Sequence, residues 1–307
     1  MASETVLITG ATGFVGVELT SKLKSVGYDV ITAARDDSNA GHGPEIARLP
    51  SPDEPDAAFE AILAGVDHVV HLAAIAHANL ENATEVYNSV NFVLPVKLAR
   101  AADKTIRGKF VFMSSIRAQC ASIHQGVALE TDEPKPTDDY GRAKLKAEIG
   151  IAEVMPRRNY TILRPVLVYG AGVKGNMAAL MKLAALPIPL PFRSLVGKRS
   201  LVDRSSLCNA VIHCLNQPKT NGGTFIVADT SPVTVPQIVG AMRRAKKRRS
   251  LLFACPVWVM DALASITGQR GRWDTLSGNL VASSKLLQST GWQAVENTPA
   301  EIEKLVG

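Results

Sequence analysis

Cysteine is scarce in this chain of 307 residues, and no long hydrophobic run is present. The four cysteines show neither C-x-x-C spacing nor nearby histidine pairs, so a zinc site is not expected and reduced, structural thiols are the default. The apolar stretch at 251–260 reaches about half of the roughly 20 residues that a membrane helix needs, and Pro256 interrupts it. A membrane-spanning helix is therefore excluded.

The N-terminus also lacks the basic and apolar regions of a signal peptide, because a strand-like run begins already near Val6. We therefore expect a cytoplasmic protein. Hydrophobic residues make up 46% and charged residues 20% of the chain, which is typical of a globular protein with one extended or two unequal domains.

The formal charge of +6 is concentrated in one basic run at Arg243–Arg249. Without that run the charge is near neutral, so nucleic acid is not an expected partner. We interpret the run as a solvated helix end, and a weak peripheral contact with a membrane surface or another polyanion is the alternative.

Hydrophobic periodicity alternates between strand and helix through the first half of the chain. The pattern predicts strands at 5–9, 29–34, 66–73, 109–115 and 160–164, and helices at 14–26, 56–64, 83–102 and 139–155. Such alternation specifies an α/β fold with a doubly wound parallel sheet, because parallel strands need crossover connections. We predict a dinucleotide-binding Rossmann domain over 1–165. A smaller, less regular substrate-binding region over 166–307 would return some segments to the sheet and cover its carboxyl edge, where ligands bind.

A glycine-rich turn, Gly10-Ala11-Thr12-Gly13-Phe14-Val15-Gly16, connects the first predicted strand and helix. Glycine permits a tight turn and a close approach of the backbone, while the helix N-terminus offers free N–H groups and the positive end of its dipole. The turn therefore predicts a binding site for the pyrophosphate of a dinucleotide, formed by Gly10, Gly13, Phe14, Val15 and Gly16.

The spacing G-x-x-G-x-x-G resembles that of the extended short-chain dehydrogenase/reductase family. NAD-selective members of that family carry an acid at the tip of the second strand, whereas this sequence has Ala34 followed by Arg35. Loss of the acid removes repulsion of a 2′-phosphate and Arg35 supplies a cation, so we expect NADP in preference to NAD. The resemblance also assigns the H-L-A-A segment with Leu72, Ala73 and Ala74, together with Asn91 and Pro165, to the cofactor site.

The sequence Tyr140-Gly141-Arg142-Ala143-Lys144 matches the family's Y-x-x-x-K motif. Residues four apart share one helix face, and a nearby cation lowers the pKa of a phenol by favouring phenolate. By resemblance, Lys144 also binds the nicotinamide ribose. Ser115 ends the fourth predicted strand 25 residues before Tyr140 and is the expected third catalytic residue, with Ser114 as the alternative. A non-catalytic NAD(P)-binding regulator remains a second interpretation.

The segment Leu163-Arg164-Pro165-Val166-Leu167-Val168-Tyr169-Gly170 resembles the L-R-P-x-x-V-Y-G of sugar-nucleotide epimerases, reductases and dehydratases. The resemblance implies that Asn176 and Arg199 contact the diphosphate of the substrate, and Arg270 and Arg272 are weaker candidates. Guanidinium binds phosphate bidentately, which agrees with this role for Arg199.

Within the family the sequence resembles bacterial UDP-sugar 4-epimerases and 4-ketoreductases of polysaccharide biosynthesis, including enzymes that reduce UDP-4-keto-6-deoxy-N-acetylglucosamine. A 4,6-dehydratase would carry an Asp-Glu pair after Ser115, but Ile116 and Arg117 stand there, so elimination has no acid/base pair. The missing acid at Ala34 suits an exchangeable cofactor and favours a 4-ketoreductase, with a UDP-sugar 4-epimerase as the alternative. The resemblance also implies a homodimer formed through the helices at 83–102 and 139–155.

Overall fold

A computed structural model describes residues 3–35, 46–76, 83–173, 175–266, 273 and 277–306. Its centre is a parallel sheet of seven strands in the order β11-β7-β5-β4-β1-β2-β3. The strands are β1 (Thr5–Thr9), β2 (Asp29–Ala34), β3 (Ile46–Arg48), β4 (His68–His71), β5 (Phe110–Met113), β7 (Tyr160–Pro165) and β11 (Gly223–Val227). The predicted fold class is confirmed: this is a doubly wound Rossmann sheet, with its topological switch between β1 and β4.

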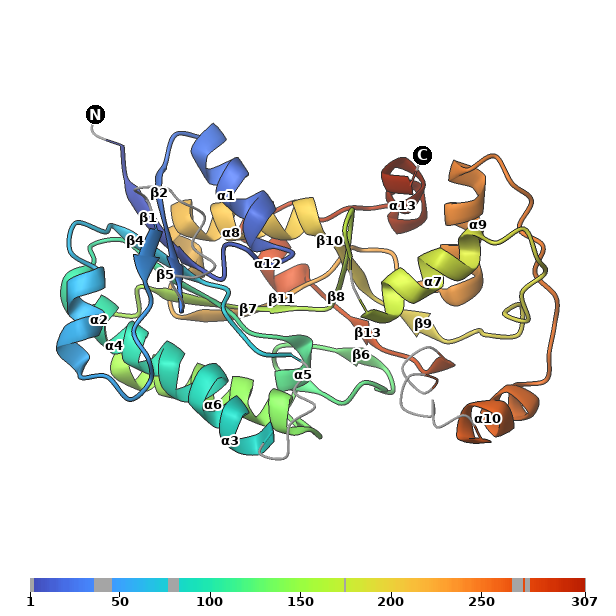
Figure 1. Ribbon diagram of the computed structural model, residues 1–307, viewed down its shortest axis with the longest axis horizontal. Helices are drawn as coiled ribbons and strands as arrows, with labels where there is room; N and C mark the ends of the chain where they lie inside the picture. Colours follow the sequence, from blue (N-terminus) through green and yellow to red (C-terminus); the bar gives the residue numbers. More distant parts are fainter. Residues whose placement is uncertain are drawn as a thin grey trace.

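Helices cover both faces of the sheet (Figure 1). One face carries α2 (Asp56–Ile62), α4 (Leu94–Thr105) and α6 (Asp139–Val154), and the other carries α1 (Gly16–Ser25), α8 (Arg204–Asn216) and α12 (Lys285–Gln288). Side chains alternate along β1, so Val6 and Ile8 pack on the α1 and α8 side while Leu7 packs on the α4 side. The sheet is thus buried between two apolar layers.

The helix predicted over 83–102 is divided in the structure. It consists of α3 (Ala83–Tyr87), a π-helical segment η2 (Asn88–Val93) and α4, which extends to Thr105. Pro95 lies in the first turn of α4, where its ring would clash with the carbonyl of Asn91 in a regular α-helix. The wider π-turn avoids that clash.

The region after Pro165 contains more regular structure than its sequence predicted. The small strands β8 (Leu167–Tyr169) and β10 (Leu201–Asp203) pair in parallel, and β11 pairs with β7 at the edge of the main sheet. The helices are α7 (Gly175–Ala185), α8, α9 (Val235–Ala245), α10 (Val257–Ile266), α12 and α13 (Thr298–Val306). Remaining short elements are α5 (Ile116–Gln119), β6 (Val127–Ala128), β9 (Lys198–Arg199), η3 (Pro218–Thr220), β12 (Val233–Thr234) and β13 (Val281–Ala282).

A third apolar core joins α7, α9 and α13 into a smaller lobe beside the sheet (Figure 1). Segments of the second half thus contribute both to this lobe and to the Rossmann sheet, while a domain boundary at residue 165 stays a prediction. Among the described helices, none is long and apolar enough to cross a bilayer. Three of the four free cysteines are buried, and Cys255 is partly exposed.

Candidate active site

The glycine turn between β1 and α1 is held close to the segment that follows β4. Gly10 has a φ of +74°, and a Cβ atom there would lie 2.7 Å from the backbone nitrogen of Ala73. At Gly16 a Cβ would lie 2.2 Å from the carbonyl oxygen of Gly10. No described side chain caps the N-terminus of α1, so the positive end of its dipole is open to an anion.

A cleft of about 520 Å³ opens beside this turn. Its described lining includes residues from all three predicted parts of the cofactor site: Gly10, Ala11, Thr12, Gly13, Thr32, Ala33, Ala34, Arg35, Ile46, Leu49, Leu72, Ala73 and Ala74. The volume lies within the range of small-molecule sites, roughly 300–1,000 Å³. A close-fitting glycine cradle next to such a cleft fits the pyrophosphate and adenosine of a dinucleotide.

Asn91 contributes to the cleft by holding the backbone at Ile75, directly after the lining segment 72–74. Its buried amide accepts a hydrogen bond from the backbone N–H of Ile75 at 2.9 Å and donates to the Ile75 carbonyl at 2.8 Å. Thr9 holds the same region, since its hydroxyl accepts from the backbone N–H of Ala73 and hydrogen-bonds His71 Nδ1 at 2.9 Å. The structure thus assigns Asn91 to positioning the 72–75 segment.

Ser115, Tyr140 and Lys144 meet at the carboxyl edge of the sheet, between β5 and α6. The Ser115 hydroxyl lies near enough to the Tyr140 phenol to affect the pKa of that phenol, and it accepts from the backbone N–H of Arg117 at 3.2 Å. Lys144 is only 1% exposed; its Nζ donates to the Met113 carbonyl at 2.8 Å and lies 4.6 Å from the centre of the Phe112 ring. The arrangement brings a hydroxyl, a phenol and an amine together at the carboxyl edge of the sheet.

The ionisation of these groups differs from the expectation that Lys144 lowers the pKa of Tyr140. Burial is the largest effect and raises the pKa of Tyr140 to about 12, against a smaller lowering by the Ser115 hydrogen bond. Burial also lowers the pKa of Lys144 to about 7, although Glu148 opposes that shift. The ammonium group interacts with the Met113 carbonyl and the Phe112 ring, and the phenol stays protonated at neutral pH in the protein alone.

Ser114, the alternative to Ser115, points away from Tyr140 into a buried polar network. Its hydroxyl donates to Glu148, whose carboxylate also pairs with Arg164, and Arg164 in turn donates to Gln119. This network joins β5, α6, β7 and α5 behind the site. It was not anticipated from the sequence, and the only sequence signal was Arg164 within the L-R-P segment.

Two arginines extend the site beyond the catalytic residues. Arg117 forms an ion pair with Asp138, the residue that caps α6 by accepting from the N–H of Gly141 at 2.6 Å. Arg199 is buried and donates to the Ser122 carbonyl at 2.9 Å. Burial, with the nearby charge of Arg117, lowers the pKa of Arg199 to about 10. Arg117 Nη1 and Arg199 Nε have no hydrogen-bond partner among the described residues.

The other predicted residues lie in different parts of this region. Phe14 stacks against Arg204, whose Cζ is 4.8 Å from the ring centre. Arg204 also donates to the Ala171 carbonyl at 2.7 Å and pairs with Glu18, so it connects the glycine turn to the loop after β8. Pro165 ends β7, Val15 precedes α1, and Asn176 is exposed in the first turn of α7. Arg270 and Arg272 lie outside the described residues.

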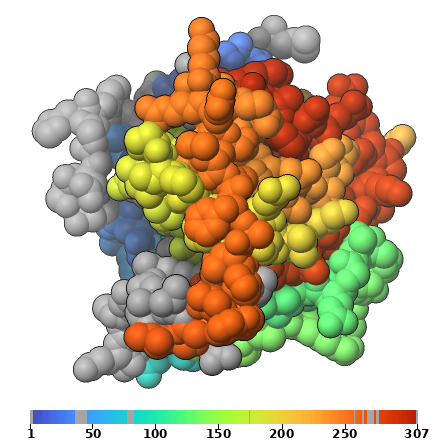
Figure 2. Space-filling view, turned by 90° about the vertical axis from the view of Figure 1, so that its right-hand side faces the viewer, coloured from blue at the N-terminus to red at the C-terminus, as the bar shows by residue number. Residues whose placement is uncertain are grey.

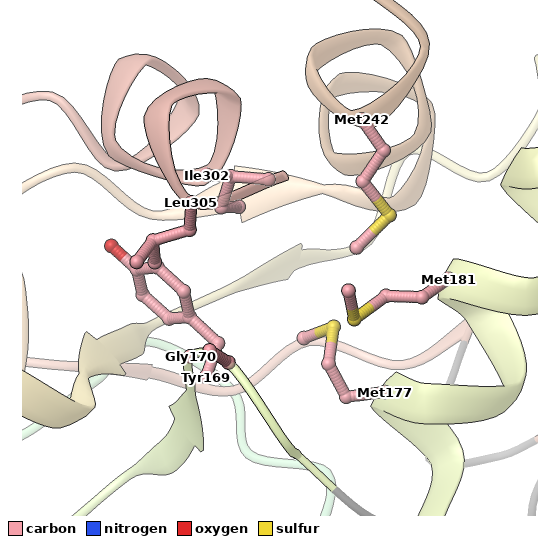
Figure 3. A pocket seen from close by; sticks show the side chains of 8 residues that line it. Tyr169, Gly170, Met177, Met181, Met242, Ile302 and Leu305 are labelled. Atoms are coloured by element: carbon pink, nitrogen blue, oxygen red, sulfur yellow. The ribbon is translucent and has the colours of Figure 1, made fainter. Parts of the chain in front are cut away.

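A second cavity lies in the smaller lobe, between α7, α9 and α13 (Figure 3). Met177 and Met181 of α7 and Met242 of α9 converge on it, opposite Tyr169 and Ile302. Its volume of about 20 Å³ is close to that of one water molecule. It is therefore too small for a sugar nucleotide. Among the described residues, no cluster of His, Cys, Asp or Glu could hold a metal ion.

Comparison with protein families identifies the architecture built around this cleft. Residues 6–228 match the model of the NAD dependent epimerase/dehydratase family, a span that covers the glycine turn and all three catalytic candidates. The chain belongs to this family.

Known proteins of the epimerase/dehydratase family cover both reactions considered above. The chain is 32% identical over 301 residues to a UDP-glucose 4-epimerase of Vibrio cholerae, which covers 94% of this chain and 90% of the relative. It is 28% identical to a dTDP-4-dehydrorhamnose reductase of Burkholderia thailandensis over 58% of this chain and 55% of that one. The resemblance to extended short-chain dehydrogenases/reductases is confirmed, as is membership in the sugar-nucleotide 4-epimerase and reductase group.

The fold of this epimerase/dehydratase family member also agrees with a solved structure. The UDP-N-acetylglucosamine 4-epimerase of Bacillus cereus superposes with a TM-score of 0.76 at 22% identity and covers 99% of each chain. The likeness therefore includes the smaller lobe as well as the Rossmann sheet.

Proposed function

We propose that this protein is a 4-ketoreductase, which uses NAD(P)H to reduce C4 of a UDP-linked 4-keto sugar. The observation that carries the proposal is the placement of the Ser115 hydroxyl next to the Tyr140 phenol, one helical turn from Lys144, at the carboxyl edge of the sheet. Ile116 and Arg117 follow Ser115 directly, so the adjacent positions offer no carboxylate for elimination.

The chain's own residues handle the proton of this reaction. A dihydronicotinamide, when bound, would supply the hydride that C4 accepts. Tyr140 donates its phenolic proton to O4, and Ser115 positions O4 by hydrogen bonding. Because burial raises the pKa of Tyr140 to about 12, the phenol is protonated and ready to donate, which suits reduction better than oxidation. Lys144, by family resemblance, would hold the ribose of the nicotinamide.

Arg199 and Arg117 suit the diphosphate of the substrate. Each carries a buried N–H without a partner among the described residues, and leaving such a donor unsatisfied is costly. An anionic oxygen would satisfy both groups. We therefore assign Arg117 to the diphosphate together with Arg199 and Asn176, the two residues expected there from the sequence.

Reduction is tested by mixing the purified protein with NADPH and UDP-4-keto-6-deoxy-N-acetylglucosamine and following nicotinamide absorbance. We expect stoichiometric NADPH consumption. Tyr140→Phe should lower the rate by about 10² to 10⁴-fold. Tyr28→Phe, which removes a hydroxyl bound only to Asn216 in the described structure, should not. No absorbance change with any UDP-4-keto sugar would instead favour the non-catalytic regulator.

A UDP-sugar 4-epimerase is the second candidate, and the Vibrio cholerae relative favours it. An epimerase retains its cofactor and reduces the same keto group after the sugar has turned. Interconversion of two UDP-sugars without net NADPH consumption would therefore replace the reductase proposal with this one.

We also propose a preference for NADP over NAD. At the tip of β2 the cleft is lined by Ala34 and the exposed Arg35, and none of the lining residues that the structure describes is an acid that would repel a 2′-phosphate. Introducing that acid by Ala34→Asp should raise KM for NADPH by about 5- to 30-fold, through repulsion of roughly 1–2 kcal/mol, and should spare NADH. Lys24→Asp, a charge change at an exposed site on α1, serves as the control. Equal effects of Ala34→Asp on both cofactors would contradict the preference.

A further inference from the structure

The smaller lobe carries a surface that the proposed reaction does not use. Two sequence segments, 171–202 and 230–260, contain no aspartate or glutamate. Their lysines and arginines together exceed the +6 formal charge of the whole chain, so the rest of the molecule is net negative. Positive charge is therefore segregated onto these segments.

The basic residues after α9 divide into one buried and several exposed groups. Arg243 is 1% exposed and binds backbone carbonyls, so it is structural. Lys246, Lys247 and Arg249 are exposed and have no ion-pair partner among the described residues, whereas Arg244 pairs with Glu303. The exposed cations beyond Arg244 are thus available to an anionic surface.

Directly after this basic segment the chain becomes apolar and remains exposed. Leu251 and Phe253 are about half exposed, and α10 presents Trp258 at 72% and Ile266 at 83% exposure. Backbone hydrogen bonds between Leu251, Phe253 and Leu190 fix the approach to α10 against the 186–193 segment, where Leu186 and Ile188 are also exposed. Large apolar side chains gathered in this way mark an interaction surface.

Figure 2 shows that the segment after α9 crosses one face of the molecule as a continuous ridge, with the basic residues toward one end and α10 toward the other. The ridge lies on the smaller lobe, at the end of the molecule away from α2 and α4 (Figure 1). We call the exposed part of residues 246–266 the lobe ridge; it carries one acid, Asp261 of α10, against the cations at its other end.

The charge of the lobe ridge decides between possible occupants. A second copy docked through the same surface would bring like charges together. Nucleic acid would satisfy the cations, and an unpaired base could stack on the indole, but the exposed leucine and isoleucine side chains would stay in contact with water or phosphate. An anionic bilayer satisfies both parts, because lipid headgroups attract lysine and arginine while tryptophan and apolar side chains enter the interface.

We propose that the lobe ridge docks this protein peripherally on an anionic lipid bilayer, with α10 lying in the interface and Lys246, Lys247 and Arg249 contacting headgroups. The inference does not rest on the proposed reductase function. A soluble UDP-sugar substrate would leave it unchanged.

The test is co-sedimentation of the full-length protein with vesicles of phosphatidylcholine alone or mixed with phosphatidylglycerol. We expect binding to the mixed vesicles to be at least about tenfold tighter, and to weaken with added salt. Lys246→Glu combined with Lys247→Glu should abolish the preference, and Trp258→Ser should weaken binding. Val26→Ser, at a 56% exposed site at the end of α1, is the matched control and should bind normally.

Tryptophan fluorescence provides a second measurement. Of the three tryptophans, Trp273 and Trp292 are buried, so a blue shift on adding anionic vesicles would report Trp258. Trp258→Phe should remove that shift while retaining binding. Turnover of a soluble substrate should be the same in Trp258→Ser and unmodified protein, which separates this proposal from the enzymatic one.

The proposal would be overturned by no binding to mixed vesicles, by equal binding of the double glutamate variant, or by a dimer that Trp258→Ser dissociates in the absence of lipid. The last result would assign the lobe ridge to a second copy of the chain. Tighter binding to DNA or RNA than to mixed vesicles would assign it to nucleic acid.

Discussion

Gly10 is fixed by two separate constraints, its left-handed backbone and its contact with Ala73. Either constraint disfavours a side chain, and together they explain why the turn can approach both the 72–75 segment and a phosphate group. Gly27 has the first constraint alone: its φ is +96°, and a Cβ atom added there would have no described atom within 4 Å. The two glycines therefore form a matched pair.

We expect Gly10→Ala to destabilise the protein by about 2–3 kcal/mol and to weaken NADPH binding, because backbone strain adds to a clash with the Ala73 backbone. Gly27→Ala should cost only about 1 kcal/mol and leave NADPH affinity unchanged. Urea denaturation and fluorescence titration with NADPH measure the two effects. Equal losses of unfolding free energy and of NADPH affinity in both variants would show that the close approach of Gly10 to Ala73 does not contribute to either quantity.

At the scale of elements, the buried side chain of Arg243 links α9 to α7 by hydrogen bonds, in addition to their shared apolar core. The guanidinium of Arg243 donates to the carbonyls of Ala184, Leu186 and Ile188, and it reaches Ser250 and Leu251 on its own side of the loop. Arg243 thereby satisfies carbonyl groups at and beyond the C-terminal end of α7. The interpretation of the whole run as a solvated helix end is therefore wrong for this residue.

Arg243→Met should lower the free energy of unfolding by about 3 kcal/mol or more, because several buried carbonyls lose a charged donor. Arg244→Met, which breaks an exposed ion pair with Glu303, should cost less than about 1 kcal/mol. Denaturant unfolding compares the two variants, and hydrogen exchange should show faster opening at the end of α7 only for Arg243→Met. A small effect of both substitutions would show that water replaces the guanidinium without loss.

At the scale of the whole molecule, Asp229 connects parts of the chain that lie far apart in sequence. Its carboxylate accepts from the Tyr169 hydroxyl at 2.8 Å, from the Thr298 hydroxyl at 3.2 Å and from the backbone N–H of Asp203 at 3.2 Å. Burial is the main reason that the pKa of Asp229 rises from 3.8 to about 6, and the neighbouring Asp203 adds to the rise. The carboxyl group thus joins β8, β10 and α13.

The raised pKa gives a definite sign to the pH dependence of stability. The folded protein holds the Asp229 proton more tightly than the unfolded chain does, so this contribution is complete below pH 3.8 and is lost as the pH rises through about 6. Asp229→Asn removes that dependence. The stability of the unmodified protein relative to the variant should fall by roughly 3 kcal/mol from about pH 4 to about pH 7. Chemical denaturation across this range tests it, and parallel curves would contradict it.

The sequence alone determined the parts of the molecule that depend on local pattern. Strands at 5–9 and 29–34 were predicted at their observed bounds, because buried parallel strands are short apolar runs between turns. The glycine turn and the four-residue spacing of Tyr140 and Lys144 could likewise be predicted, because each motif lies within a single turn or a single helix.

Tertiary structure decided what depends on contacts between distant residues. Strand β11 and helix α8 return to the Rossmann half, although nothing local to 204–227 specifies their neighbours. The choice between Ser114 and Ser115 required the direction of each side chain: one reaches Glu148 and the other Tyr140. The pKa of Tyr140 likewise depends on its burial, which the sequence does not show. Arg243 and Lys246 lie in one basic run, but the first is buried and the second exposed, because their burial depends on how α9 packs against α7.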